Sequence, residues 1–428
     1  MSRETSDDAD HDEQYAMYYR DRSENTMGLE RSRSPPNRDI EITDVQTTVV
    51  GGNYEWIFVR IYTDAGVTGT GEAYWGHGVE SAIREMEPLL LGENPLDIDR
   101  LYSHLIERTS GQGSIAGTIV TAISGIEIAL HDIAGKVHDM PAYQLLGGKY
   151  RDDVRVYCDA HAGEHASSLD ANEISPEDIY SPESYVDAAK DVVAEGFDAL
   201  KFDLDVPSSH VKDRANRYLR HPEIDNMVDI ASAVTEALDD DVDVAFDLHW
   251  TWSADSATRL AKQLEPYDVW WLEDPVPPEN VSIQREVTRS TSTTIVSGEN
   301  RYRSDGERGL IEQKAVDIIH PDMPKTGGMR ETQKIADLAD MYSIPVALHN
   351  VSSPLATVAA AHVAASIPHF LALEYHSRDV DWWPDLVEGP VIEDGSIAVP
   401  EKPGIGITLD MDEVADHMLD GETLFDEE

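Results

Sequence analysis

Three acidic residues stand at equal spacing along the chain, each after a short apolar run. Asp247, Glu273 and Glu299 are each 26 residues from the next, and the runs before them cover residues 242–246, 269–272 and 294–298. A short strand followed by a helix and its loops has about this length. Each acid is therefore predicted to lie where a buried strand ends. The simpler alternative is that these acids only cap the helices that follow.

In a barrel of parallel strands these strand ends meet on one face, and that face carries the active site. Three carboxylates brought together there repel one another unless a cation lies among them. Ligands that are all oxygen suit a hard divalent ion. The sequence therefore predicts one Mg²⁺ per subunit, bound by Asp247, Glu273 and Glu299.

Two histidines at strand ends have the chemistry to move protons. Asp322 and His349 end neighbouring predicted strands. Because a carboxylate on one ring nitrogen raises the basicity of the other, His349 is a candidate general base. His249 lies two residues beyond Asp247, and an extended strand would point both side chains the same way. His249 is then a candidate acid that faces the same ligand.

These groups suit removal of the proton next to a carboxylate, which is very weakly acidic. Loss of that proton gives an enediolate, whose two negative oxygens a divalent cation stabilises. Sites of the enolase type combine a Lys or His base with Mg²⁺ in this way. If His249 then protonates a hydroxyl on the next carbon, water leaves and a 2-keto acid forms. The sequence therefore predicts a dehydration.

The elements that position these residues alternate between strand and helix from residue 154 onward. Strands are predicted at 154–157, 199–202, 242–246, 269–272, 294–298, 316–320, 345–348 and 370–373. Helices are predicted between them at 182–195, 226–238, 254–264, 283–290, 328–341 and 356–366. Eight such strands close a barrel. The ionisable groups at their ends are Lys201, Asp247, His249, Glu273, Glu299, Asp322, His349 and Glu374.

The residues before the barrel read as a smaller α+β unit. Its strands are predicted at 40–50, 56–63 and 67–73, and its helices at 79–90, 97–107 and 116–137. Tyr74 and Trp75 lie on the loop that leaves the third strand. A lid that touches a ligand and ordinary packing both fit aromatic residues at that place. The segment 391–408, rich in Gly and Pro, is predicted to return to this unit.

The chain is therefore divided into an acidic arm at 1–38, a capping unit at 39–150, a barrel at 151–390 and a C-terminal return with an acidic tail at 391–428. The arm has one apolar cluster, formed by Tyr15, Met17, Tyr18 and Tyr19. A free tail and a segment that docks on a neighbouring subunit both fit this pattern.

The formal net charge of −50 over 428 residues limits the partners. Binding of nucleic acid or of an anionic membrane surface requires positive charge, so both are excluded as expectations. Cys158 is the only cysteine, which excludes a disulfide framework. No apolar N-terminal segment resembles a signal peptide. We therefore expect a cytoplasmic protein that acts on a small molecule.

So high an acidic charge on a chain with regular apolar runs indicates a folded protein adapted to high salt. Salt shortens the range of the repulsion between like charges, so it stabilises the compact state of such a chain. We expect the melting temperature to rise between dilute buffer and molar KCl. An unchanged or falling melting temperature would contradict salt adaptation.

These residues resemble the enolase superfamily in its mandelate racemase branch, and most of all the acid-sugar dehydratases of the gluconate and galactonate type. The resemblance covers about residues 39–410. The motifs that carry it are Asp247-Leu248-His249, Trp271-Leu272-Glu273-Asp274-Pro275, Gly298-Glu299-Asn300, His320-Pro321-Asp322 with Lys325 and Gly327-Gly328, and then His349 and Glu374. It implies an α/β fold with a modified (β/α)₇β barrel and an α+β capping domain.

The resemblance also implies roles for single residues. Mg²⁺ binding falls to Asp247, Glu273 and Glu299, and the base is His349 with Asp322. Glu374 hydrogen-bonds a carboxylate oxygen of the substrate, and His249 matches the general acid of the dehydratases. Family habit further implies a homo-oligomer, from dimer to octamer.

One departure from the family is informative. The racemases carry Lys-x-Lys on the second barrel strand, whereas this chain reads Lys201-Phe202-Asp203. A racemase needs a base on each face of the substrate, so Asp203 disfavours racemisation and favours dehydration by two histidines. Lys201 either faces a ligand carboxylate or forms a salt bridge with an acid such as Asp247 or Glu273.

The predicted substrate is an aldonic acid, with D-gluconate and D-xylonate ahead of galactonate. The residues expected to bind it are Lys201, His249, His349 and Glu374 together with Tyr74 and Trp75 of the cap loop. Two other functions remain open. An acid-sugar racemase, epimerase or cycloisomerase would keep the fold and change the reaction. A binding protein would have the same fold and no catalytic activity.

Overall fold

The structure is a computed structural model that describes residues 40–161, 180–206 and 214–426. The acidic arm at 1–38, with its tyrosine cluster, lies outside the described residues. Residues Glu41–Glu428 form one compact unit by themselves, separate from Met1–Ile40. All that follows concerns the described residues of this larger unit.

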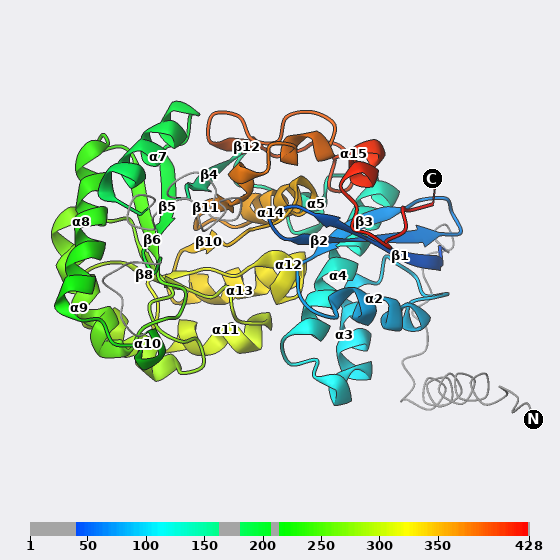
Figure 1. Cartoon of the computed structure of the whole chain (residues 1–428). Helices are drawn as coiled ribbons and strands as arrows, with labels where there is room; N and C mark the ends of the chain where they lie inside the picture. Colours follow the sequence, from blue (N-terminus) through cyan, green and yellow to red (C-terminus); the bar gives the residue numbers. More distant parts are fainter. Residues whose placement is uncertain (1–39, 162–179, 207–213, 427–428) are drawn as a thin grey trace, which may run out of the picture. The chain divides into compact units, whose positions relative to one another are not determined.

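Eight parallel strands close the predicted barrel. They are β4 (Asp153–Asp159), β5 (Ala199–Asp203), β6 (Asp243–Asp247), β7 (Leu272–Glu273), β8 (Ile295–Ser297), β9 (Ile318–Ile319), β10 (Val346–Leu348) and β11 (Phe370–Tyr375). Each pairs with the next in chain order, and β11 pairs in parallel with β4, so the sheet closes on itself. Figure 1 shows these strands inside a layer of helices. The predicted fold class is confirmed.

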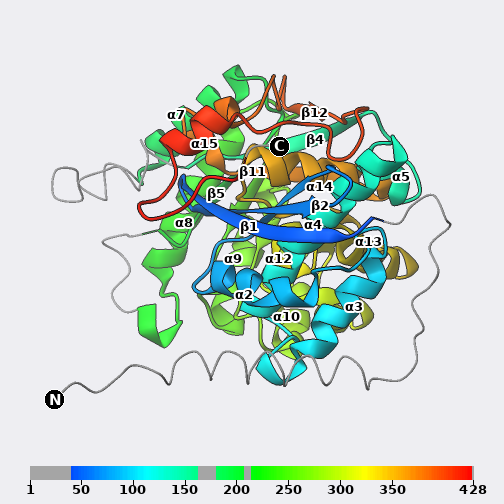
Figure 2. The same ribbon diagram turned by 90° about the vertical axis from the view of Figure 1, so that its right-hand side faces the viewer.

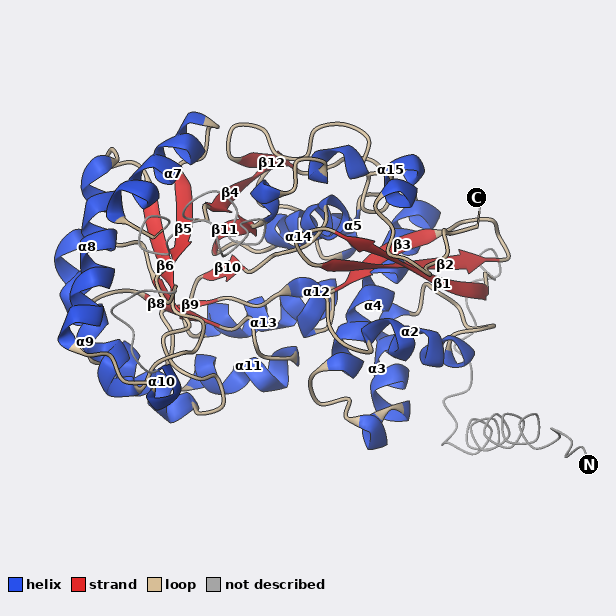
Figure 3. Ribbon diagram, in the orientation of Figure 1, coloured by secondary structure: helices blue, strands red, loops and turns tan. Residues whose placement is uncertain are grey.

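Seven longer helices join the eight strands in the described part of the chain. They are α7 (Pro182–Ala194), α8 (His221–Ala237), α9 (Ala254–Leu264), α10 (Val281–Thr288), α11 (Arg303–Glu312), α13 (Met329–Met341) and α14 (Pro354–Ser366). Figure 3 shows them in blue around the red strands. The short helix α12 (Met323–Thr326) lies between β9 and α13. This is the (β/α)₇β pattern that the family resemblance implies.

The axis of the barrel is filled by one side chain from each strand. This buried layer consists of Tyr157, Ala199, Ala245, Trp271, Val296, Ile318, Ala347 and Ala372. Side chains on a strand alternate between its two faces. The residue two positions further along each strand therefore returns to the barrel axis, now at the carboxyl end of the sheet.

The capping unit is an antiparallel sheet covered by helices. Its strands β1 (Ile42–Gly51), β2 (Glu55–Thr63) and β3 (Gly69–Ala73) pair in that order, and its helices are α2 (Val79–Met86), α3 (Ile98–Arg108) and α4 (Thr118–His138). A Cβ at Gly71 would lie 2.3 Å from the carbonyl oxygen of Gly125, so glycine lets α4 lie directly on β3. By length and composition α4 could cross a membrane, but 89% of its most apolar window is buried inside the protein.

Two buried glutamates of the capping unit reach helices of the barrel. Glu127 of α4 accepts hydrogen bonds from the backbone N–H groups of Met329 (2.7 Å) and Arg330 (3.0 Å) at the start of α13. Glu72 of β3 accepts from the backbone N–H of Ser353 (3.1 Å) just before α14. Carboxylates satisfy the free N–H groups at helix N-termini and favour their dipole. These contacts join the cap to the barrel.

The C-terminal segment also contacts both parts of the fold. Strand β12 (Ser396–Ala398) pairs antiparallel with β4. Further on, the backbone N–H of Leu419 donates to the carbonyl of Val49 (2.9 Å) in β1. Figure 2 shows this red segment beside the blue strand β1.

The sequence-based elements differ from the structure in two informative places. Helix α11 is absent from the prediction, because Gly306 and Gly309 interrupt it and Leu310 and Ile311 are its only buried apolar residues. Helix α8 begins at His221, five residues before the predicted start, since its first turn is polar and contains proline. Elements without an apolar repeat are therefore the ones that pattern reading misses.

Candidate active site

A ring of ionisable residues lies at the carboxyl ends of the barrel strands. We call it the inner ring; it consists of the residues two positions after the axial layer, namely Asp159, Lys201, Asp247, Glu273, Gly298, His320, His349 and Glu374. All eight are buried. Strand alternation thus brings seven ionisable side chains to the end of the barrel where parallel barrels carry their active sites.

Lys201 is the centre of the inner ring. Its Nζ lies 2.7 Å from Oε1 of Glu374, 3.0 Å from Oε1 of Glu273, 3.5 Å from Oδ2 of Asp247 and 4.0 Å from Oδ2 of Asp159. Burial opposes the charge on this lysine, but Glu273 and Glu374 raise its pKa well above the usual range. Lys201 is therefore a fixed cation among four acids, and the predicted salt bridges to Asp247 and Glu273 are present.

Glu273 is held in place by three neighbours. Its Oε2 accepts a hydrogen bond from the indole Nε1 of Trp271 (3.0 Å), and its Oε1 faces Lys201 and, at 3.4 Å, Nδ1 of His320. The pKa of Glu273 is raised to about 8, mainly by burial and also by the charges of Asp247 and Glu299, against the effect of Lys201. Such a carboxylate is crowded by negative charge, and an additional cation would relieve it.

His349 has the partner that a general base requires. Its Nδ1 lies 2.7 Å from Oδ2 of Asp322, which β9 and β10 place side by side. Its Nε2 faces the carboxylates of Glu299, in close contact, and of Glu374 at 3.8 Å. Burial lowers the pKa of His349, but Glu299, Glu374 and Asp322 together raise it well above the usual range. The geometry leaves Nε2 as the nitrogen that faces the inner ring.

Glu299 lies one position beyond the inner ring. Gly298 takes the ring position itself with φ +152°, and a Cβ there would lie 2.9 Å from the backbone of His320. The carboxylate of Glu299 accepts from Nδ2 of Asn300 (2.7 Å), whose Oδ1 accepts from Nζ of Lys325 (2.8 Å). Asn300 and Lys325 therefore orient Glu299 from the side.

The cap loop reaches this side of the barrel. The ring of Tyr74 lies 6.2 Å from the ring of His349, and Nζ of Lys325 lies 4.6 Å above the Tyr74 ring. Trp75 is 40% exposed and stacks on Tyr54 with ring centres 5.2 Å apart. Of the two predicted cap residues, Tyr74 is thus the one beside His349, whereas Trp75 contacts aromatic residues of the cap.

His249 reaches the site by a different path from the predicted one. Strand β6 ends at Asp247, and His249 has a left-handed backbone with φ +42° instead of an extended one. A side-chain oxygen of Asp247 accepts from the backbone N–H of His249 (2.8 Å), which stabilises this turn. The imidazole still faces Asp247, with Nε2 3.7 Å from its Oδ2, while Nδ1 lies 2.9 Å from Oδ1 of Asp205. His249 therefore lies beside Asp247 as predicted, but the predicted extended strand does not continue to His249.

The electrostatics of His249 suit an acid. The pKa of His249 is raised to about 12, mainly by the charge of Asp247 against the effect of burial, and also by the hydrogen bond that its Nδ1–H donates to Asp205. The imidazole is therefore protonated over the neutral pH range. Asp203, which replaces the second lysine of the racemases, lies on the same side, with Oδ1 3.9 Å from Nε2 of His249.

Several residues of the site were not found by reading the sequence. The most important is Asp159, because the predicted first strand stops at Tyr157 while β4 continues to Asp159. The same alternation that joins Ala245 to Asp247 would have found it from Tyr157. Asp205, His161 and His376 were also missed. His161 and His376 follow Asp159 and Glu374 of the inner ring by two positions, as His249 follows Asp247, so this spacing could have found them.

Oxygen and nitrogen atoms that can bind a metal converge at two places in the described residues. The ligand atoms lie within 4.8 Å of one another in the group Asp203, Asp247 and His249, and again in the group Asp159, His161 and His376. Glu273 and Glu299 belong to neither group; Lys201 contacts the carboxylate of Glu273, and His349 contacts that of Glu299. The protein thus has groups that can hold a metal, and Asp247 is the predicted ligand found in one of them.

Comparison with known proteins supports an enzyme of this architecture. Residues 35–147 match the mandelate racemase/muconate lactonizing enzyme N-terminal domain, and residues 184–414 match the enolase C-terminal domain-like family. The structure superimposes on a mandelate racemase/muconate lactonizing enzyme-like protein from Rubrobacter xylanophilus with a TM-score of 0.86 and 40% identity, covering 91% of this chain and 100% of the other.

Two curated relatives are dehydratases of sugar acids. A D-xylonate dehydratase from Haloferax volcanii is 60% identical over 98% of both chains. A D-gluconate dehydratase from Thermoproteus tenax is 31% identical over 82% of this chain and 68% of its own. With both domains matched and the barrel closed, the chain belongs to the mandelate racemase/muconate lactonizing enzyme family of the enolase superfamily.

Proposed function

We propose that this protein is an Mg²⁺-dependent dehydratase of an aldonic acid, with D-xylonate as the first substrate and D-gluconate as the second. The observation that carries the proposal is the 60% identity, over 98% of both chains, to a D-xylonate dehydratase. The reaction is removal of the proton next to the carboxylate and loss of the hydroxyl on the following carbon. Its product is a 2-keto-3-deoxy sugar acid.

His349 acts as the general base and His249 as the general acid in the two proton transfers. Nε2 of His349 faces the inner ring, while Asp322 on Nδ1 fixes the tautomer and orients the ring. His349 removes the proton next to the carboxylate and His249, held protonated by Asp247 and Asp205, gives a proton to the leaving hydroxyl. Glu374 and Lys201, 2.7 Å apart, orient the substrate carboxylate.

The carboxylates of the inner ring fit a hard divalent cation. Asp247, Glu273 and Glu299 supply only oxygen ligands, and the raised pKa of buried Glu273 shows the crowding that a cation would relieve. Mg²⁺ bound by these three residues would stabilise the negative charge that proton removal places on the substrate carboxylate. The positive charge of Lys201 would also stabilise this negative charge on the substrate carboxylate.

A racemase or epimerase is the second candidate, because the family includes such enzymes. It would need a second base opposite His349. The chain places Asp203 where the racemases carry a lysine, and burial together with Asp159 raises the pKa of Asp203 to about 7. Exchange of the α-proton in D₂O without loss of water would favour this candidate over dehydration. We further propose that the enzyme is a cytoplasmic homo-oligomer.

The proposal is tested with the purified protein in molar KCl and Mg²⁺ against a panel of aldonic acids. We expect a 2-keto acid from D-xylonate and, at lower kcat/KM, from D-gluconate, measured by semicarbazone absorbance and by NMR of the product. D-galactonate completes the panel. Formation of no 2-keto acid from any member would contradict the proposal and favour a binding protein on the same fold.

The role of His249 gives a separate prediction. His249→Asn removes the acid and leaves His349 and Asp322 in place, so we expect dehydration to fall by about 10²–10⁴-fold while α-proton exchange in D₂O continues. Parallel NMR measurement of both reactions checks this. His221→Asn, at an exposed histidine where α8 begins, is the matched control. Unchanged product formation in His249→Asn would show that another group is the acid.

A further inference from the structure

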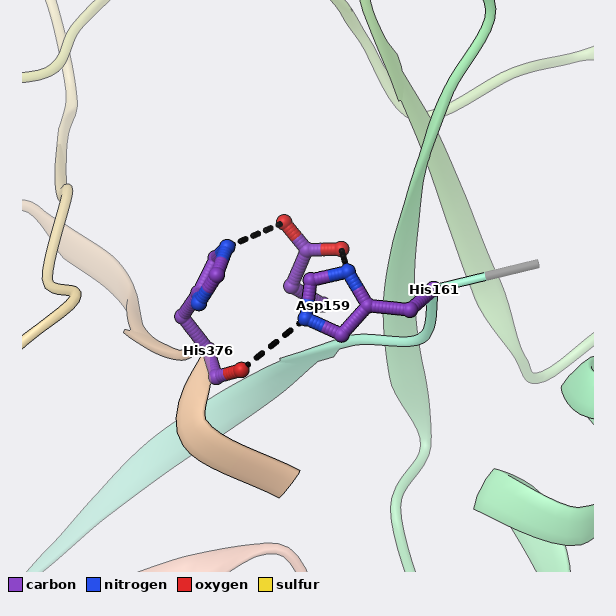
Figure 4. A group of neighbouring side chains, drawn as sticks. All are labelled: Asp159, His161 and His376. Atoms are coloured by element: carbon purple, nitrogen blue, oxygen red, sulfur yellow. Dashed lines mark hydrogen bonds and ion pairs between the residues drawn. The ribbon is translucent and has the colours of Figure 1, made fainter. Parts of the chain in front are cut away.

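A second group of histidines stands beside the inner ring. Figure 4 shows Asp159 between His161 and His376. Oδ1 of Asp159 lies 3.5 Å from Nδ1 of His161, and Oδ2 lies 3.9 Å from Nε2 of His376. Asp159 is only 3% exposed, and its Oδ1 has no hydrogen-bond partner among the described residues. A buried carboxylate in this position is costly unless something else hydrogen-bonds to it.

Hydrogen bonds fix which nitrogen of His376 carries a proton. Its Nδ1 lies 3.0 Å from Nδ2 of Asn53, which is a donor. Asn53 is itself oriented, because its Nδ2 donates to Asp379 (3.1 Å) and its Oδ1 accepts from the backbone N–H of Tyr54 (3.0 Å). Nδ1 of neutral His376 is thus an acceptor, and the proton is on Nε2, which faces Asp159.

His161 is fixed in the same way. Its Nε2 lies 3.1 Å from the backbone carbonyl oxygen of His376, which can only accept, so Nε2 carries a proton. Nδ1 faces Asp159 at 3.5 Å, longer than a good hydrogen bond. Burial lowers the pKa of His161, but Asp159 and Asp203 raise it above the usual value. Nε2–H of His376 is therefore a donor that faces Asp159 without closing on it, and Nδ1 of His161 is a second donor only when that ring is protonated.

This assignment argues against a metal, although Asp and two His are typical ligands of Zn²⁺ and Fe²⁺. A metal needs a free electron pair on Nε2 of His376, and that nitrogen holds the proton. Nζ of Lys201 also lies 4.0 Å from Oδ2 of Asp159, so a second cation would meet an existing one. The site instead offers an anionic acceptor beside the Nε2–H donor of His376, and a hydroxyl group can donate to the first and accept from the second.

We propose that Asp159, His161 and His376 form a subsite that binds a hydroxyl group of the sugar acid remote from its carboxylate, and so determine which sugar acid is used. The hydroxyl donates to Asp159 and accepts from Nε2 of His376, or from Nδ1 of His161 when that ring is protonated. The inference rests on the proposed function, since it concerns the far end of the same substrate.

The position of the subsite fits this role. Asp159 belongs to the inner ring, next to Lys201, where the substrate carboxylate is proposed to bind. His161 and His376 follow Asp159 and Glu374 by two residues, one layer nearer the cap, and Asn53 and Tyr54 of the turn between β1 and β2 contact His376. A chain of carbons that starts at Lys201 and extends toward the cap therefore passes this group.

The test compares D-xylonate with its 4-deoxy and 5-deoxy analogues. Binding is measured by calorimetry in the His349→Asn background, so that turnover is not required, and kcat/KM is measured with His349 intact. We expect one analogue to bind the unchanged subsite about 10–100-fold more weakly than D-xylonate, because a hydrogen bond to a charged group is lost. In Asp159→Asn, which removes that charge, the same ratio should fall below about 3-fold, and in His161→Gln or His376→Gln it should fall part of the way. His221→Gln, an exposed histidine, is the matched control.

Several outcomes would overturn the inference. If His161→Gln and His376→Gln weaken the binding of D-xylonate and of both analogues equally, the cluster has only a structural role. If they weaken the binding of none of the three, the cluster has no role in binding. A second equivalent of Zn²⁺ or Mn²⁺ bound beside Mg²⁺, and lost in His161→Gln, would make it a metal site. If the protein binds none of the sugar acids, both the proposed function and the proposed subsite are wrong. If it binds D-xylonate but the variants do not change the ratio of affinities between D-xylonate and its deoxy analogue, only the subsite is wrong.

Discussion

Replacement of His349 by asparagine is expected to abolish exchange of the proton next to the carboxylate and, with it, all product formation. The expected loss is about 10²–10⁴-fold or more in both reactions, because a positioned general base contributes this much. Nδ1 of His349 is occupied by Asp322 at 2.7 Å, so Nε2 is the nitrogen that can take the proton. Asparagine keeps a polar group near Asp322 and Glu299 but has no basic nitrogen.

Two measurements make this result specific to the base. Asp322→Asn should reduce kcat with little change in KM, because Asp322 orients and tunes His349 without touching the substrate. His221→Asn, at the exposed start of α8, should leave both rates unchanged. The assignment is wrong if His349→Asn exchanges the α-proton at the wild-type rate while its melting temperature in molar KCl is normal.

The barrel was predictable because its strands are short apolar runs at regular intervals. Asp247, Glu273 and His349 follow from the same regularity, since each stands two residues beyond an axial residue of the barrel. Asp159 obeys the same rule after Tyr157 and was missed only because the first strand was ended too early. Strand alternation is therefore a better guide to this site than the intervals between acids.

Other features could not be read from one sequence. Lys201 contacts four carboxylates from four different strands, and only the closure of the barrel brings β11 beside β4. The contact of Tyr74 with His349 likewise depends on how the cap meets the barrel. The turn at His249 follows from a hydrogen bond between Asp247 and the backbone of His249, which a rule about extended strands does not include.

The affinity for Mg²⁺ should depend on Glu299, and this dependence separates two roles for that residue. In the structure Glu299 contacts Nε2 of His349, so it acts as the partner of the base, whereas the proposed function makes it a metal ligand. We expect Glu299→Gln to raise the Mg²⁺ concentration at half-maximal activity by more than the ~10–100-fold typical of a residue outside the ligand shell. Excess Mg²⁺ should restore part of kcat.

If Glu299 serves only His349, the Mg²⁺ titration of Glu299→Gln stays at the wild-type midpoint and the pH profile of kcat changes instead. Its charge is one of the causes that raise the pKa of His349, so its loss would move the acidic limb of that profile, on which His349 loses its proton, to lower pH. Glu286→Gln, at an exposed glutamate of α10, controls for the removal of one charge from an acidic protein. A midpoint shifted by more than about 100-fold, seen also by direct calorimetry without substrate, places Glu299 on the metal, because a residue outside the ligand shell typically changes metal affinity by only ~10–100-fold.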